Sequence, residues 1–277
     1  MPPFPFPVGN RARLGTRLSS VDANGLREEL ARAVEGEVRF DALNRALYAS
    51  DASNFRQPPI GVVIPRSVDD IAAAHRVCRE YGAPITARGT GTSLAGQAVN
   101  RAVILDLSRH LTAIGDVDAG ARTVRAEPGA INGRVSRAAR RSGLVFGPDP
   151  SSHAHCTIGG NVGTNACGAH SVQADLFGPG PRTSDNVESL EVLTYDGLRL
   201  TVGPTPAAAL DAILAAGGRR ATIYRGLAEL ADRYAGLIRE RFPQLPRRVS
   251  GYNLDELLPE NGFNVARALV GTEGTCV

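Results

Sequence analysis

A glycine-rich stretch at residues 88–96, Arg-Gly-Thr-Gly-Thr-Ser-Leu-Ala-Gly, contains the residue types that hold an anion. Gly89 and Gly91 carry no Cβ, so their backbone N–H groups can converge on a ligand. Hydroxyl and guanidinium donors stand beside them, on Arg88, Thr90, Thr92 and Ser93. This donor set predicts a phosphate or pyrophosphate site. Because the third glycine of a G-x-G-x-x-G motif is missing, a tight turn without a ligand is the alternative.

A second polar stretch runs from the turn Gly-Pro-Asp-Pro-Ser-Ser at 147–152 to the segment Thr-Ile-Gly-Gly-Asn-Val-Gly-Thr-Asn-Ala-Cys-Gly at 157–168. Glycines let the backbone approach a flat ligand closely, while asparagine and threonine side chains offer hydrogen bonds to its heteroatoms. The stretch therefore suits a planar ring with polar edges. An ordinary loop held by its asparagine side chains is the alternative.

Histidine and cysteine side chains also lie in this part of the sequence, at His153, His155, Cys156 and Cys167. A closed zinc site needs four ligands in tetrahedral geometry, and none of the four cysteines of the chain forms a C-x-x-C pair. We predict no metal site and four free thiols.

All 31 basic side chains are arginine, since the sequence contains no lysine. This excludes a G-K-S/T phosphate loop, a Schiff-base lysine and a Ser-Lys dyad. The formal net charge of +3 over 277 residues is too small to predict a nucleic-acid partner. No apolar run reaches the roughly 18–20 residues that span a bilayer, and Met1–Pro7 lacks a signal-peptide pattern. We expect a cytoplasmic protein, with peripheral attachment at the inner membrane left open.

The segments that must position the glycine-rich stretch alternate between strand and helix. Residues 61–64, 84–87 and 103–107 are short apolar runs typical of buried strands. Between the first two, Ser67-Val68-Asp69-Asp70 fits a capping box and begins a helix that ends at Gly82. The glycine-rich stretch follows the second strand directly, at the edge where α/β sheets bind ligands.

The second half of the chain predicts a less regular set of elements. They are a strand at 123–127, a helix at 131–143 with a solvated arginine face, a β-hairpin at 190–202, a helix at 223–237 and a strand at 265–270. The dipeptide Asp196-Gly197 predicts a type I′ turn in the hairpin. In the first half, His75 and Cys78 fall on the apolar side of a helix and are expected in the core.

Together these motifs resemble the FAD-binding domain of the vanillyl-alcohol oxidase and p-cresol methylhydroxylase (PCMH) type, in its glycolate oxidase and D-lactate dehydrogenase branch. The matching segments, in family order, are VIPRSVDDIAAAHRVCREYGAPITARGTGTSLAGQAV, VILDLSRHL, VRAEPGAINGRV, GPDPSSHAHCTIGGNVGTNACGAH, DNVESLEVLTYDG, SGYNL and LVGTEGT. The resemblance implies an α+β fold in which FAD lies between two α/β subdomains, about 60–111 and 112–277. Residues 1–55 are then an N-terminal extension to a domain at 56–277, and the family's C-terminal cap domain is expected to be absent.

The resemblance also implies which residues hold the cofactor. Arg88–Ser93 would bind the pyrophosphate, and the second stretch would line the ribityl chain and the isoalloxazine ring. The implied residues are Arg88, Gly89, Thr90, Gly91, Thr92, Ser93, Pro148, Asp149, Ser152, Thr157, Ile158, Gly159, Gly160, Asn161, Gly163 and Thr164. Some relatives attach the flavin through a histidine in the first loop. Thr92 stands at that position, which implies non-covalent FAD.

The implied activity is an FAD-dependent dehydrogenase or oxidase that oxidises a small 2-hydroxy acid such as D-lactate or glycolate by hydride transfer to flavin N5. The catalytic base and the electron acceptor are unassigned, and Arg248 and Tyr252 are candidates for the substrate side. Relatives imply an iron–sulfur or cap-domain partner. The alternatives are a non-catalytic FAD-binding subunit or truncated fragment that needs a partner, and a reductase of the same fold that uses NADPH.

Overall fold

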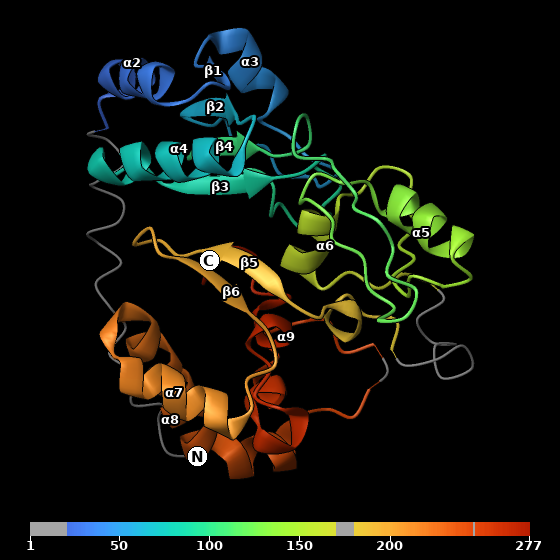
Figure 1. The fold of residues 1–277 in the computed structure, drawn as a ribbon. Helices are drawn as coiled ribbons and strands as arrows, with labels where there is room; N and C mark the ends of the chain where they lie inside the picture. Colours follow the sequence, from blue (N-terminus) through green and yellow to red (C-terminus); the bar gives the residue numbers. More distant parts are fainter. Residues whose placement is uncertain (1–20, 170–179, 246) are drawn as a thin grey trace.

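The first layer of the molecule is a four-stranded sheet (Figure 1). The computed structural model describes residues 21–169, 180–245 and 247–277, and Met1–Pro7 lies outside these ranges. The strands are β1 (Glu37–Arg39), β2 (Gly61–Ile64), β3 (Ile85–Arg88) and β4 (Val103–Asp106), in the order β1-β2-β4-β3. β2, β4 and β3 are parallel, and β1 is antiparallel to β2. The three predicted strands are confirmed, and β1 is an additional one.

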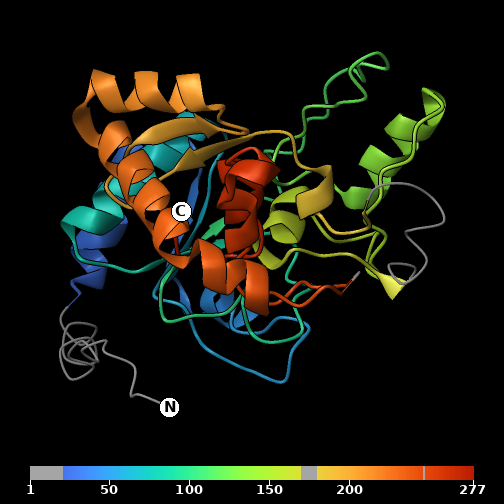
Figure 2. The same ribbon diagram turned by 90° about the horizontal axis from the view of Figure 1, so that it is seen from below.

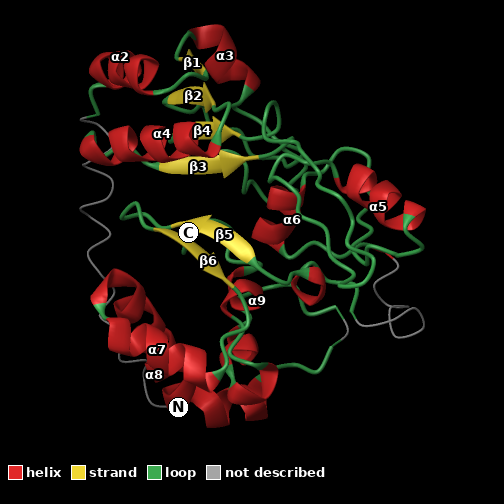
Figure 3. Ribbon diagram, viewed as in Figure 1, coloured by secondary structure: helices red, strands yellow, loops and turns green. Residues whose placement is uncertain are grey.

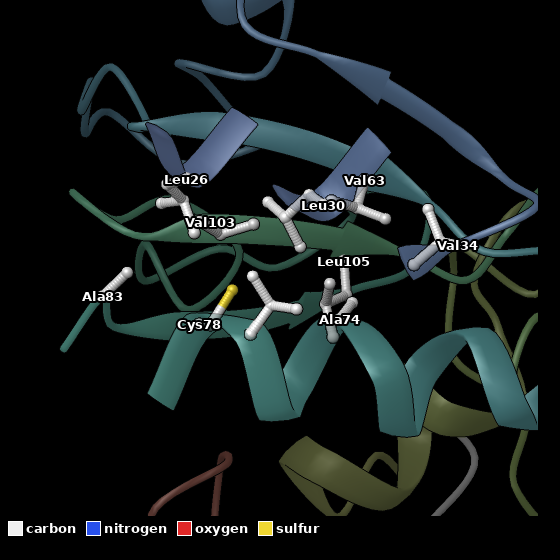
Figure 4. Close-up of a cluster of buried hydrophobic side chains, with 10 residues drawn as sticks. Leu26, Leu30, Val34, Val63, Ala74, Cys78, Ala83, Val103 and Leu105 are labelled. Atoms are coloured by element: carbon white, nitrogen blue, oxygen red, sulfur yellow. The ribbon is translucent and has the colours of Figure 1, made fainter. Parts of the chain in front are cut away.

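Helices cover this sheet because β2 and β4 are buried along their whole length. On one face, α2 (Ala23–Ala33) lies beside α4 (Val68–Glu80), and Leu26 and Leu30 of α2 join side chains of α4 and of the strands in one buried cluster, as Figure 4 shows. The other face carries a smaller cluster beside Tyr48, which follows α3 (Ala42–Leu47). The part of the expected N-terminal extension that the structure describes thus contributes β1, α2 and α3 to this layer.

The predicted N-cap of α4 is confirmed at Ser67, whose Oγ accepts a hydrogen bond from the Asp70 N–H at 3.1 Å. The Asp70 carboxylate does not return that bond. It accepts instead from the N–H groups of Glu35 and Arg66, at 2.9 and 2.8 Å, and so ties α4 to the segment before β1. Cys78 is buried in the core beneath α4, as predicted, whereas His75 is buried against the ring of Tyr195, with the ring centroids 5.7 Å apart.

Replacing Ser67 by alanine should lower the free energy of unfolding by about 1 kcal/mol, because an N-cap hydroxyl satisfies one of the unpaired N–H groups of the first turn. Urea denaturation followed by circular dichroism measures this difference. The control is Ser142→Ala, since Ser142 is exposed and its side chain makes no hydrogen bond in the described part of the chain. Equal losses in the two variants would contradict the assigned cap.

The predicted hairpin is confirmed as β5 (Leu190–Leu193) and β6 (Arg199–Val202), but its turn is of another type. Gly197 has a φ of 89°, whereas Asp196 does not have the positive φ that a type I′ turn requires. The Thr194 N–H pairs with the Leu198 carbonyl at 3.0 Å, and three residues remain in the loop. The turn is therefore a three-residue hairpin loop that ends in a left-handed glycine.

Two long helices pack beside the hairpin, α7 (Ala207–Ala216) and α8 (Gly218–Arg241), and α8 contains the helix predicted at 223–237. Short helical turns follow at η4 (Leu254–Leu257) and η5 (Pro259–Asn261). The prediction of a strand at 265–270 was wrong, because these residues form α9 (Val265–Leu269). The Asn264 side chain caps α9, and a short apolar run does not distinguish a strand from a buried helix.

The strand predicted at 123–127 was also wrong. Thr123 and Ala126 form only isolated bridges, to Asp118 and Ile114, beside Arg122 with its positive φ of 58°. Much of the chain between β4 and β5 is loop, as Figure 3 shows. The exceptions are α5 (Asn132–Arg141), α6 (Ile158–Thr164) and η3 (Ser184–Asn186).

The small helix α6 occupies a central position in the described chain. It lies beside the carboxyl ends of β3 and β4 in Figure 1, and next to α9 in Figures 1 and 2. Within the described ranges, no helix combines the length and the apolar character needed to cross a membrane.

Candidate functional site

The loop that follows β3 has a row of free hydrogen-bond donors. Within the described ranges, none of the six backbone N–H groups from Gly89 to Leu94 donates to another protein group. The side chains of Thr92 and Ser93 are half-buried in the same loop. Gly91, with a φ of 74°, holds the left-handed conformation in which adjacent N–H groups can turn toward one anion.

Arg88 fixes the start of this loop through its side chain. The guanidinium donates to the carbonyls of Ser50 and Ala98, both at 3.0 Å, and lies over the Tyr48 ring. The Tyr48 hydroxyl in turn donates to the buried Asp106 at the end of β4, at 2.5 Å. Burial, with the adjacent Asp106, raises the pKa of Tyr48. The guanidinium of Arg88 is thus directed toward backbone carbonyls and positions the loop, and its contact with a phosphate stays a prediction.

The structure brings the two predicted stretches together where the loop meets the start of α6. The Thr90 Oγ1 donates to the His155 carbonyl at 2.8 Å. A Cβ built on Gly89 would lie 2.2 Å from the Thr157 Oγ1, so only glycine allows this approach. Thr157 is buried and caps α6 by accepting a hydrogen bond from the Gly160 N–H.

Two buried asparagines connect α6 to the turn at residues 147–152. The Asn161 Nδ2 donates to the Asn132 Oδ1 at 2.8 Å, and the Asn132 Nδ2 donates to the Pro148 carbonyl at 3.2 Å. Asn132 is fully buried and Asn161 is 3% exposed. Pro148 is therefore held to the site through its carbonyl, whereas the Asp149 side chain is exposed and lies 3.6 Å from the His153 Nδ1.

One side of α6 packs against protein and another is bare. Gly159 packs against Pro128: a Cβ added to Gly159 would lie only 2.9 Å from the Pro128 Cβ. Gly160 is exposed, and a Cβ on Gly163 would meet nothing within 4 Å. Thr164 follows on, with its Oγ1 bonded to the Gly160 carbonyl. A helix side with two glycines offers a flat surface for a planar ligand.

A third loop, at residues 271–275, completes the site. The N–H groups of Gly271 and Glu273 donate to the carbonyls of Val162 and Gly163, at 2.8 and 2.9 Å. The Gln97 Nε2 donates to the Glu273 Oε1 at 3.3 Å. The glycine-rich loop is thus linked to both ends of α6. Sequence reasoning missed Gln97 and Glu273, although the glycines around Glu273 indicate the tight turn that places it.

The donors and surfaces present fit a dinucleotide cofactor with a planar ring. Free N–H groups and hydroxyls at 89–94 suit a pyrophosphate, and the bare side of α6 suits a ring. Fold and site together define a flavin-binding class. The family model described as "FAD binding domain" matches residues 59–203, which is just over half of the chain, and the chain belongs to this family.

Solved structures share the fold. Glucooligosaccharide oxidase from Acremonium strictum superposes with a TM-score of 0.54 at 20% identity, over 69% of this chain and 38% of that chain. A chitooligosaccharide oxidase superposes with the same TM-score at 17% identity, over 67% of this chain and 38% of that chain. The expected PCMH-type α+β fold is confirmed by these likenesses, which at such identities concern the fold alone.

Curated relatives are similar in sequence over most of this chain. The D-2-hydroxyglutarate dehydrogenase of Pseudomonas putida is 34% identical over 247 residues, which cover 87% of this chain and 24% of that protein. The glycolate oxidase subunit GlcD of Escherichia coli is 34% identical over 195 residues, 69% of this chain and 38% of that subunit. The chain spans about a quarter of the length of the D-2-hydroxyglutarate dehydrogenases that it matches.

Proposed function

We propose that this chain binds FAD non-covalently between the loop at 88–94, the side of α6 that carries Gly160 and Gly163, and the loop at 271–275. The observation that carries this proposal is the row of six N–H groups, from Gly89 to Leu94, that have no acceptor among the described residues. A pyrophosphate carries several oxygens that can accept hydrogen bonds from such groups. The loop contains neither histidine nor cysteine, which supports non-covalent binding.

We infer further that the chain belongs to an FAD-dependent oxidoreductase acting on a small 2-hydroxy acid, as do the relatives named D-2-hydroxyglutarate dehydrogenase and glycolate oxidase. FAD, when bound, supplies the atom that accepts the hydride. This chain's residues hold and orient the cofactor: Arg88 positions the glycine-rich loop, and Asn132 with Asn161 fixes the turn at Pro148 against α6. D-2-Hydroxyglutarate, D-lactate and glycolate are the candidate substrates.

The test begins with the visible spectrum of the purified chain, followed by acid precipitation. Flavin bands that move entirely into the supernatant would support non-covalent FAD, and a yellow pellet would contradict it. A colourless protein that takes up no added FAD would overturn the site. Assays with each candidate acid, its L-enantiomer where one exists, and an artificial acceptor then test the activity. Bound FAD without turnover would favour the alternative of a binding subunit.

Replacing Gly163 by leucine tests the assignment of the bare side of α6. Nothing within 4 Å opposes a Cβ there, so the stability of the apoprotein should change by less than about 1 kcal/mol. Affinity for FAD, measured by flavin fluorescence quenching, should fall at least about tenfold, since the new side chain would occupy the ring surface. Gly226→Leu on α8, which also has open space, is the matched control. Unchanged FAD affinity in Gly163→Leu would place the ring elsewhere.

A further inference from the structure

A pocket of about 580 Å³ lies at the C-terminal end of α8, and none of its lining residues belongs to the candidate FAD site. Its walls come from α8, η4, η5, α9 and the segment around η3. Ile238, Phe242 and Leu258 provide apolar surface, and the remaining lining is mostly charged. Its size falls within the range of small-molecule sites.

Three arginines of the pocket are already neutralised by carboxylates within it. The pairs are Arg182 with Asp185 at 2.5 Å, Arg248 with Asp255 at 2.5 Å, and Arg239 with Glu260 at 2.7 Å. In the first two pairs the side chains are only 11–24% exposed. Arg248, which the sequence indicated as a candidate for the substrate side, is therefore engaged here. These arginines have little capacity left for an added anion.

Glu256 is the acidic residue of the pocket that has no arginine partner in the described chain. The residue is 8% exposed, yet within the described chain its carboxylate accepts no hydrogen bond, and its oxygens are not sealed from the pocket. Its backbone is fixed on both sides, because its N–H donates to the Asn253 carbonyl and its carbonyl accepts from the Asn264 N–H at 2.7 Å. The adjacent Asp255 has a second unpartnered acceptor, its buried Oδ1.

An unpartnered carboxylate at this depth is unfavourable. Burial raises the pKa of Glu256; Arg267 and Arg182 lower it, and Asp255 and Asp185 raise it. Arg267 makes no hydrogen bond to this carboxylate within the described chain; its Nε donates to the Val187 carbonyl at 3.3 Å, and it is the one arginine of the pocket without a carboxylate partner there. A ligand that brings N–H donors would remove the cost of leaving a buried acceptor unpaired.

We propose that this pocket binds a small organic cation, an ammonium or guanidinium compound, with the Glu256 carboxylate as its principal acceptor. The Glu256 carboxylate lines the pocket, is buried and has no hydrogen-bond partner in the described chain, so it favours a ligand that brings N–H donors. The described residues contain no group of three or more metal-ligating side chains that could hold a metal ion. The apolar walls from Ile238 and Leu258 suit the carbon skeleton of such a cation.

Isothermal titration calorimetry on the full chain tests this proposal with methylguanidinium and n-butylammonium chloride, and with sodium acetate as the anionic comparison. At least one cation should bind, and Glu256→Gln should weaken that binding at least about tenfold, as expected for loss of a charged hydrogen-bond partner. The two cations distinguish a guanidinium from an ammonium ligand. Glu240→Gln is the matched control, because Glu240 is exposed, lies outside the pocket and pairs with Arg241.

Measuring cation binding to the unmodified chain at several pH values makes the test independent of how the Glu256→Gln variant folds. Burial raises the pKa of Glu256, and protonation removes its negative charge, so binding should weaken as the pH is lowered toward that raised pKa. Asp255 and Asp185, which face Glu256, each keep an arginine partner. Binding unaffected by pH and by Glu256→Gln, tighter binding of acetate, or no detectable heat with either cation would overturn the proposal.

Discussion

Replacing Gly89 by alanine should abolish stable FAD retention while leaving the rest of the molecule folded. The new Cβ would lie 2.2 Å from the Thr157 Oγ1 and 3.2 Å from both its Cβ and its Cγ2, so rotating the threonine does not remove the clash. Thr157 is buried and fixed as the cap of α6, and the loop must therefore move instead. Overpacking of this kind costs about 1–3 kcal/mol. A displaced loop would also turn the backbone N–H groups of residues 89–94 away from the bound pyrophosphate, so FAD affinity should fall about tenfold to a hundredfold.

Flavin content after gel filtration and a fluorescence titration of the apoprotein measure this loss. Gly226→Ala in α8 is the matched control, since a Cβ there meets nothing within 4 Å and alanine favours a helix. In a Thr157→Ala background the cost of Gly89→Ala should shrink, because two of the three clashing atoms are gone. Normal FAD retention in Gly89→Ala would contradict the assignment of this loop to the cofactor.

The three parallel strands and α4 were predictable because their signals are local, whereas β1, α2 and α3 were expected to lie outside the domain. β2 and β4 are continuous apolar runs, and α4 begins at a serine cap and ends before Gly82. The glycine-rich stretch was correctly placed after β3 for the same reason. Where a run of apolar residues had no such flanking signal, as at 265–270, the sequence could not distinguish a strand from α9.

The contacts that assemble the site were not predictable, since they join distant residues. The Thr90 hydroxyl meets the His155 carbonyl 65 positions away, and Gln97 meets Glu273 across 176 positions. Residue types indicated a phosphate loop and a ring-binding segment, but only the fold shows that the loop at 88–94 and the loop at 271–275 both contact α6. Arg88 is an example. Its residue type predicted a phosphate contact, but in the structure its guanidinium donates to three backbone carbonyls.

Asn132 joins the two parts of the second stretch, and its replacement by alanine should cost about 2–4 kcal/mol of unfolding free energy. The side chain is fully buried and both accepts from the Asn161 Nδ2 and donates to the Pro148 carbonyl, so alanine leaves two buried polar groups unpaired. The variant should also lose FAD affinity, since the turn at Pro148 is no longer held to α6.

Urea denaturation of the apoprotein and an FAD titration of the folded variant separate the two effects of Asn132→Ala. The matched control is Asn24→Ala in α2, because Asn24 is exposed and its side chain makes no hydrogen bond in the described chain, so its stability should change by less than about 0.5 kcal/mol. A loss of stability with unchanged FAD affinity would show that the asparagine pair supports the fold alone. Losses in both would mean that α6 and the turn at Pro148 act on the cofactor as one unit, because the only groups removed are those that join them.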